Sequence, residues 1–201
     1  MAGRYLENHF TPQVLDAQKR YYGHSRLVPS QPERDLLTAE ETDFIAQRDG
    51  FYLTTISSNG WPYIQHRGGP PGFLKVIAPN VLAFADYPGN RQMLSTGNLD
   101  GNDRVALFLM DYPRRERLKI MGHAKVLDAR DHPDLAAQLV KPAEVKSVER
   151  IFRVEVVSFD WNCAKYITPR YTEDEVRKAT KPLLERIAEL EEKLANRNEP
   201  S

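Results

Sequence analysis

Basic side chains stand next to glycines at two places in the sequence. His66-Arg67-Gly68-Gly69 ends a stretch of strand-like composition, and Gly89-Asn90-Arg91-Gln92 leads into good helix-forming residues. Glycine lets backbone N–H groups approach a ligand because no Cβ intervenes, and an arginine fork can bind phosphate through two parallel hydrogen bonds. The N-terminus of a helix adds partial positive charge for an anion. These residue types are therefore compatible with a local phosphate site.

Lys75 is a third cation near these glycines, inside the apolar run at residues 73–77. A charge there is unfavourable unless it faces solvent or has a partner. Each feature alone also has an ordinary explanation: Arg67 before two glycines is typical of a surface turn, and the stem of Lys75 can cover apolar surface. The residues by themselves leave both a phosphate-bearing ligand and plain surface positions open.

Aromatic and basic residues also gather near the end of the last predicted strand. Trp161 and Arg170 could stack on and pair with a flat, charged ligand, or they could close the end of a barrel or a subunit contact. Cys163 is the only cysteine. No histidine is near it in sequence, which favours a buried, inert thiol over a nucleophile.

Several common catalytic and metal-binding patterns are absent from the sequence. It contains no G-x-G-x-x-G, no G-x-x-x-x-G-K-[ST], no G-x-S-x-G and no H-E-x-x-H. With one cysteine and scattered histidines, we expect no metal site.

The overall charge of the chain is balanced. Lys and Arg together number 28, as do Asp and Glu, so no global field attracts nucleic acid or an anionic membrane. The N-terminus lacks the apolar core of a signal peptide, and no apolar stretch approaches the roughly 20 residues that span a bilayer. Together with the single cysteine, this makes the cytoplasm the expected compartment and excludes membrane and nucleic-acid partners.

The elements that must position these residues are mostly strands. The segments with β-type composition are residues 51–57, 61–65, 73–77, 81–84, 104–110, 118–127 and 151–159. Helices are predicted at 11–20, after the capping box Thr38 to Glu41, at 89–94, at 131–139 and at 173–197. The pattern predicts a mainly β, α+β protein built on a small antiparallel barrel.

Three parts follow along the chain: an N-terminal arm at 1–37, a central domain at 38–171 and a C-terminal helix at 172–201. The apolar residues of the C-terminal helix recur at helical spacing, which is typical of a helix packed on its own domain. A short helix-pairing seam is the alternative.

In order and spacing, four pieces of residues 38–171 resemble the FMN-binding split-barrel family of pyridoxamine 5'-phosphate oxidase. They are FYLTTISSNGWPYIQHRGGPPGFLKV, LAFADYPGNRQMLSTGNLDGNDRVALFLMDYP, RLKIMGHAKV and DWNCAKYITPR. The chain is most similar to the branch with an HRGGPPGF turn. The resemblance implies an antiparallel six-stranded split barrel that forms a homodimer, with FMN at the subunit interface.

The resemblance also implies roles for individual residues. Those implied to bind FMN are His66, Arg67, Gly68, Gly69, Lys75, Asn90, Arg91 and Gln92 from one copy, with Arg117, Lys119, Trp161 and Arg170 completing the set. Gln92 stands where the family has a lysine, and the Gly-Gly-Pro-Pro insertion makes the match of Arg67 inexact.

The function implied is an FMN-dependent oxidoreductase that transfers hydride between the flavin and a small-molecule substrate. No side chain is assigned as acid or base. A non-catalytic binder or store of flavin, heme or a deazaflavin is the alternative.

Overall fold

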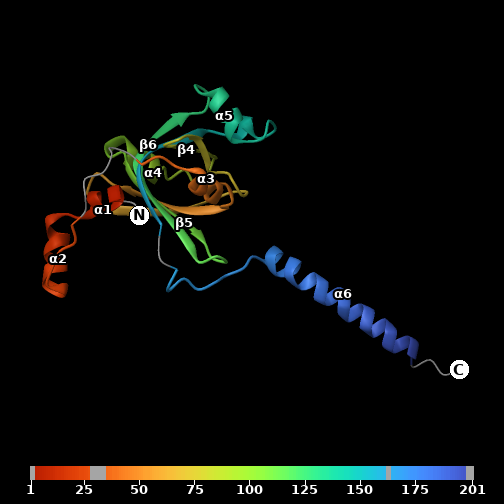
Figure 1. Ribbon diagram of the computed structural model, residues 1–201. Coiled ribbons are helices and arrows are strands. Elements are labelled where there is room, and N and C mark those ends of the chain that lie inside the picture. The colour runs from red at the N-terminus through yellow and green to blue at the C-terminus, as the bar shows by residue number, and fades with distance from the viewer. Residues whose placement is uncertain (1–2, 28–34, 162–163, 198–201) are drawn as a thin grey trace.

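The computed structural model describes residues 3–27, 35–161 and 164–197 (Figure 1). Seven strands form one antiparallel sheet: β1 Gly50–Ile56, β2 Pro62–Gly68, β3 Lys75–Ala78, β4 Val81–Asp86, β5 Arg104–Asp111, β6 Glu116–Asp128 and β7 Arg150–Trp161. The α-helices among the described residues are α1 Gly3–His9, α2 Pro12–Tyr22, α3 Ala39–Ala46, α4 Leu94–Gly101, α5 Pro133–Leu139 and α6 Glu173–Arg197, and a 3₁₀ turn spans Val145–Ser147.

The predicted mainly β class with added helices is confirmed, but the expected six-stranded barrel is not matched in detail. The strand order is β2-β1-β5-β6-β7-β4-β3, so β2 and β3 are the two edges of an open ladder. All seven predicted β segments join this ladder, because even the four residues of β3 pair with β4. The count of six came from the resemblance and is wrong here.

The sheet curls so that its two edge regions come close together. The ring of Phe51 on β1 lies 5.3 Å from that of Phe84 on β4 and 5.6 Å from that of Phe73, centroid to centroid. One cause of the bend is a register shift between β6 and β7 at Met121 and Gly122. The concave side therefore encloses the main hydrophobic core, and residues of β2 reach those of β4.

Helix α3 covers one end of this core. Phe44 and Ile45 are buried against it, and the predicted capping box is present, with the Thr38 backbone N–H donating to the Glu41 carboxylate at 2.9 Å. Arg48 follows the helix and forms a 2.6 Å ion pair with buried Asp111 of β5. The helix is thus fixed to the sheet by both packing and charge.

The helix predicted at 89–94 is wrong: residues 89–93 form an irregular loop, and α4 begins at Leu94. Arg91 and Met93 have φ values of 61° and 57°, in the left-handed region that a right-handed helix cannot contain. Good helix propensity at these positions is overridden by the loop. No helix among the described residues is both long and apolar enough to cross a membrane.

Gly122 marks the tightest contact between β6 and β7. A Cβ added there would lie 2.4 Å from the Glu155 backbone oxygen and 2.9 Å from Cγ1 of Val154. We predict that Gly122→Ala lowers the free energy of unfolding by about 2–3 kcal/mol, as expected for overpacking against backbone. Urea unfolding followed by tryptophan fluorescence measures this change.

Gly101→Ala is the matched control, since a Cβ at Gly101 would meet nothing within 4 Å at the end of α4. That variant should keep or slightly raise stability. Equal stability of the two variants would contradict the role given to Gly122.

Candidate functional site

A cavity of about 250 Å³ lies between β2 and the chain that follows β4. Strand β2 contributes Tyr63, Gln65 and Arg67, the half-buried side chains that alternate with exposed ones along the strand. The opposite wall consists of the loop after β4 and the first turn of α4. Arg150, the first residue of β7, and Glu149 before it also line the cavity.

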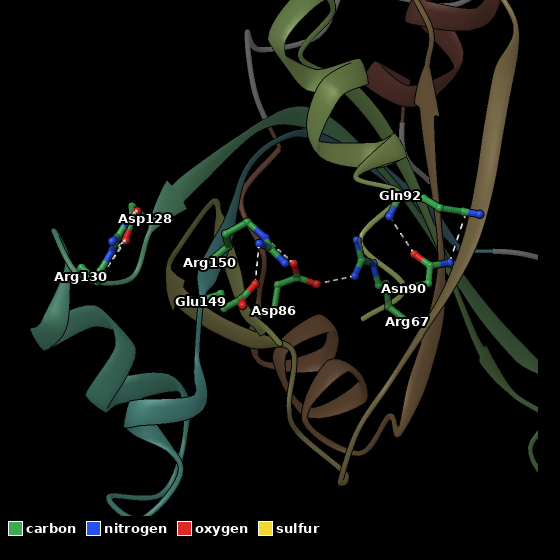
Figure 2. A network of polar contacts seen from close by, with 8 residues as sticks. All are labelled: Arg67, Asp86, Asn90, Gln92, Asp128, Arg130, Glu149 and Arg150. Carbon is green, nitrogen blue, oxygen red and sulfur yellow. Dashed lines mark hydrogen bonds and ion pairs between the residues drawn. The ribbon is translucent and has the colours of Figure 1, made fainter. Parts of the chain in front are cut away.

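Asp86 connects the strands around this cavity. Its Oδ1 accepts a 2.6 Å hydrogen bond from Arg67 of β2, and its Oδ2 accepts one of 2.8 Å from Nε of Arg150. Asp86 and Arg150 are cross-strand partners of β4 and β7, and Arg150 also donates to Glu149 at 2.7 Å. Figure 2 shows the Asp86 carboxylate between the two guanidiniums. The carboxylate therefore fixes both cations at the cavity wall.

The guanidinium of Arg67 is held by rings as well as by charge. Its Cζ lies 4.8 Å from the ring centroid of Phe152 and 5.7 Å from that of Phe84. Its Nε is buried and has no hydrogen-bond acceptor among the described residues. A buried donor is normally satisfied, so this N–H is one of the few exceptions among the described residues.

The loop at residues 89–93 is a compact turn with strained backbone. The Asn90 side-chain oxygen accepts from the backbone N–H of Gln92 at 3.1 Å, and the Asn90 amide nitrogen donates to the Gln92 side chain at 3.2 Å (Figure 2). Left-handed backbone at Arg91 and Met93, neither of them glycine, costs about 1 kcal/mol or more each. Such strain is typical of ligand-holding loops.

The first turn of α4 faces the same cavity. Leu94, Ser95 and Thr96 line it, and the N-cap residue Met93 makes no side-chain capping bond. The N–H groups of a first helical turn lack partners within the helix, so they can meet an anion. Ser95 donates to Gln65 of β2 at 3.0 Å, which ties the helix start to the strand.

The charged side chains that line the cavity favour an anion. They are the three arginines Arg67, Arg91 and Arg150 against the two carboxylates Asp86 and Glu149, which leaves an excess of one positive charge. Burial lowers the pKa of Arg150, but the hydrogen bonds and charges of Asp86 and Glu149 outweigh it and raise the pKa overall. Arg150 therefore remains a cation, and the cavity suits one small anionic group such as a phosphate.

Two further recesses extend the cavity past Tyr87. The first is lined by Arg67, Gly68, Phe73 and Asp86 among others, and the second is a larger space of about 720 Å³. Gly68, Gly69 and Lys75 line the larger space, together with residues 70–73 and residues near α5. Lys75 thus lies beside the cavity of the arginines rather than within it.

Tyr87 lines all three spaces. Burial, and secondarily the negative charge of Glu144, raises the pKa of its hydroxyl. The hydroxyl therefore keeps its proton at neutral pH and is a hydrogen-bond donor at the wall shared by these spaces.

His66 is on the opposite side of β2 from Arg67. Its ring packs edge-on against Tyr52 at 5.6 Å between centroids, and it closely approaches the positions where Gly50 and Gly68 would carry a Cβ. His66 also contributes to the rim of the middle recess. His66 does not line the arginine cavity itself.

The structure does not bring Arg117, Lys119, Trp161 and Arg170 to the cavity within one chain. Lys119 pairs with Asp160 at 2.6 Å, and Arg117 and Arg170 lie over the rings of Phe108 and Tyr112. Trp161 packs edge-on against Phe44 of α3 and donates from Nε1 to Glu41 at 2.7 Å. In this chain, Trp161 contributes to the packing of α3.

Sequence reasoning missed Asp86 and Arg150, the ion pair between β4 and β7. Asp86 ends an apolar strand and Arg150 begins another, and a charge at such an edge was the available signal. Their pairing depends on strand order, which the sequence does not show.

Among the described residues, no group of three or more His, Cys, Asp or Glu side chains is placed to hold a metal ion. Cys163 lies outside the described residues.

Comparison with known proteins gives one family and several similar folds. The family model described as pyridoxamine 5'-phosphate oxidase matches residues 37–161. A candidate pyridoxamine 5'-phosphate oxidase from Lactobacillus delbrueckii is 17% identical with a TM-score of 0.50, covering 66% of this chain and 99% of its own. HupZ of Group A Streptococcus is 11% identical with a TM-score of 0.50, covering 68% and 100%. At these identities the likeness concerns the fold. No curated protein matches the sequence.

We predict that Asp86→Asn destabilises the protein, because it leaves the part-buried guanidinium of Arg67 without a counter-charge and that of Arg150 with Glu149 alone. The expected loss is about 2 kcal/mol, below the roughly 3–5 kcal/mol for a fully buried pair. The free energy of unfolding in urea is the measurement.

Asp103→Asn provides the control, since Asp103 pairs with His123 at a half-exposed site. Its loss should be within about 0.5 kcal/mol. Similar losses in the two variants would mean that the Asp86 network does not hold the strands together.

Proposed function

The chain belongs to the pyridoxamine 5'-phosphate oxidase family, and on that premise we propose that it is an FMN-dependent oxidoreductase. In this proposal the FMN phosphate is bound in the arginine cavity. The substrate is a small molecule that enters the adjoining larger space.

The observation that carries this proposal is the convergence of anion-binding groups on one cavity. Arg67 and Arg150 line the cavity with guanidiniums that Asp86 holds in place, and Arg91 supplies an exposed guanidinium. The uncapped first turn of α4 adds backbone N–H groups. This donor set fits a phosphate, whose oxygens accept several charge-assisted hydrogen bonds at once.

The two adjoining recesses support a flat ligand larger than a phosphate. Both are lined by Tyr87. The smaller recess also has apolar walls from Phe73 and Phe84. Apolar walls with a few polar groups are typical of cofactor sites. Lys75 is a cation at the wall of the outer space, where it can meet an anionic group of a substrate.

The chemistry in this proposal is divided between cofactor and protein. FMN, when bound, supplies hydride transfer. The chain binds and orients it: Asp86 holds Arg67 in place, Arg91 offsets phosphate charge, and Tyr87 donates a hydrogen bond from the groove wall. No side chain needs to act as an acid or a base.

A second copy of the chain completes the site in this proposal. Arg117 and Lys119, which lie away from the arginine cavity in one chain, would come from the partner, and Arg170 would approach the same site. The face of β1, β2 and β5 offers an apolar surface for such a pair, with Ile64 exposed by 63% and Tyr52 by 39%. A recess of about 390 Å³ on this face is lined by Phe108 and Lys119.

We predict that Arg91→Ala weakens FMN binding by about 10-fold to 100-fold, because a hydrogen bond to a charged group contributes about 1.5–3 kcal/mol. Titration of the protein with FMN, followed by quenching of flavin fluorescence, gives the Kd. Reduction of the bound flavin by NADH or NADPH, seen as bleaching of its visible absorption, tests whether the protein is an oxidoreductase.

Arg114→Ala is the control, because Arg114 is an exposed arginine in the turn after β5 and does not line the cavity. It should leave the Kd unchanged. Equal affinities in the two variants would contradict the phosphate site. A protein that binds no FMN would contradict the proposed function, and bound FMN that no reductant bleaches would favour storage.

A further inference from the structure

Helix α6, Glu173–Arg197, leads away from the sheet (Figure 1). Along its length it exposes an apolar stripe. Val176, Leu183, Leu184, Ile187, Leu190 and Leu194 are each between 43% and 65% exposed. In this position the helix does not pack on its own domain, the interpretation that its spacing favoured. An exposed stripe of this kind is unusual on an isolated protein and marks a contact surface.

The stripe has the spacing of a coiled-coil seam. Residues 176, 180, 183, 187, 190 and 194 are separated alternately by four and three positions. In heptad lettering, Thr180, Ile187 and Leu194 occupy a positions, and Val176, Leu183 and Leu190 occupy d positions. A repeat of 3.5 residues keeps one face of a helix directed at a partner helix over its whole length.

We propose that α6 pairs with α6 of a second copy of this chain as a parallel, two-stranded coiled coil. The residue types support two strands, because the β-branched Ile187 at an a position lies between Leu183 and Leu190 at d positions. Thr180 is the polar member of the seam, and its hydroxyl is satisfied by the Val176 backbone oxygen at 2.9 Å.

The flanking positions are complementary between two parallel copies. In a parallel pair, each g residue meets the e residue five positions later on the partner. Arg186 at g would then meet Glu191 at e, and Ala179 at g would meet Leu184 at e. Each pairing occurs twice by symmetry. Leu184 lies outside the a and d positions, but Ala179 of the partner copy would cover it.

An antiparallel arrangement would bring e positions together, where Arg177 of one copy would face Glu191 of the other, and it would also bring g positions together. Arg186 and Lys193, both basic, occupy g positions, and their repulsion opposes this arrangement. In the single chain, Glu189 on the outer face already pairs with these two side chains at 2.5 Å each. Glu189 occupies a c position, so its ion pairs lie outside the seam.

Pro182 does not interrupt the seam. It lies inside the helix and removes one backbone hydrogen bond, but its c position directs the ring away from a partner.

The stripe covers only about three heptads, which is short for a stable coiled coil in isolation. A second contact between the copies elsewhere would raise the effective concentration of one α6 for the other.

Cysteine cross-linking of the full chain tests this pairing. Cys163→Ser removes the only native cysteine. On that background, Leu190→Cys places a thiol in the seam, and Glu185→Cys places one at an outer f position of the same exposed helix. Neither residue contacts the core, so folding should be unaffected. After mild oxidation, Leu190→Cys should form at least 10-fold more covalent dimer than Glu185→Cys.

Equal cross-linking at the two positions, or none at position 190, would overturn the proposal. A mixture of Thr180→Cys and Leu190→Cys chains distinguishes the direction of pairing. Dimers of like chains support the parallel arrangement, whereas dimers only between unlike chains contradict it. Sedimentation shows separately whether two copies associate. If the protein sediments as a dimer but position 190 does not cross-link, the pairing of α6 is contradicted, while the dimer itself is not.

Discussion

The double ion pair of Asp86 is the interaction on which the site depends. One carboxylate accepts from Arg67 on an edge strand and from Arg150 on a central strand, which joins distant parts of a curled sheet. Without this charge, two guanidiniums would face each other in a part-buried space. The same bonds direct both cations to the cavity, so the stability of the fold at this edge and the positive character of the site have one physical origin.

Much of the fold follows from local sequence signals. The strands and the capping box of Thr38 and Glu41 have strong short-range patterns, and the structure has them close to the expected residues. The helix expected at 89–94 is absent because Arg91 and Met93 adopt left-handed backbone that propensity does not indicate. The role of Asp86 was also beyond sequence reasoning, since it depends on which strands become neighbours.

The candidate site, too, could be predicted from the sequence only in part. Basic residues next to glycines could be recognised in the sequence, and Arg67 and Arg91 do line one cavity. Lys75 lines the neighbouring space, and Trp161 packs against α3 in the same chain. Short spacing in sequence therefore indicated a cluster of anion-binding side chains better than it indicated which residues surround the cavity. Which residues surround the cavity is determined by the packing of the curled sheet.

The most direct test of the account is a comparison of FMN with riboflavin, which lacks the phosphate, in binding to the unaltered protein. If the arginine cavity binds the phosphate, FMN should bind at least about 100-fold more tightly, since two charge-assisted hydrogen bonds each contribute about 1.5–3 kcal/mol. The preference should fall as salt is added, because the arginines act partly through charge. Equal Kd values for FMN and riboflavin would contradict the central claim.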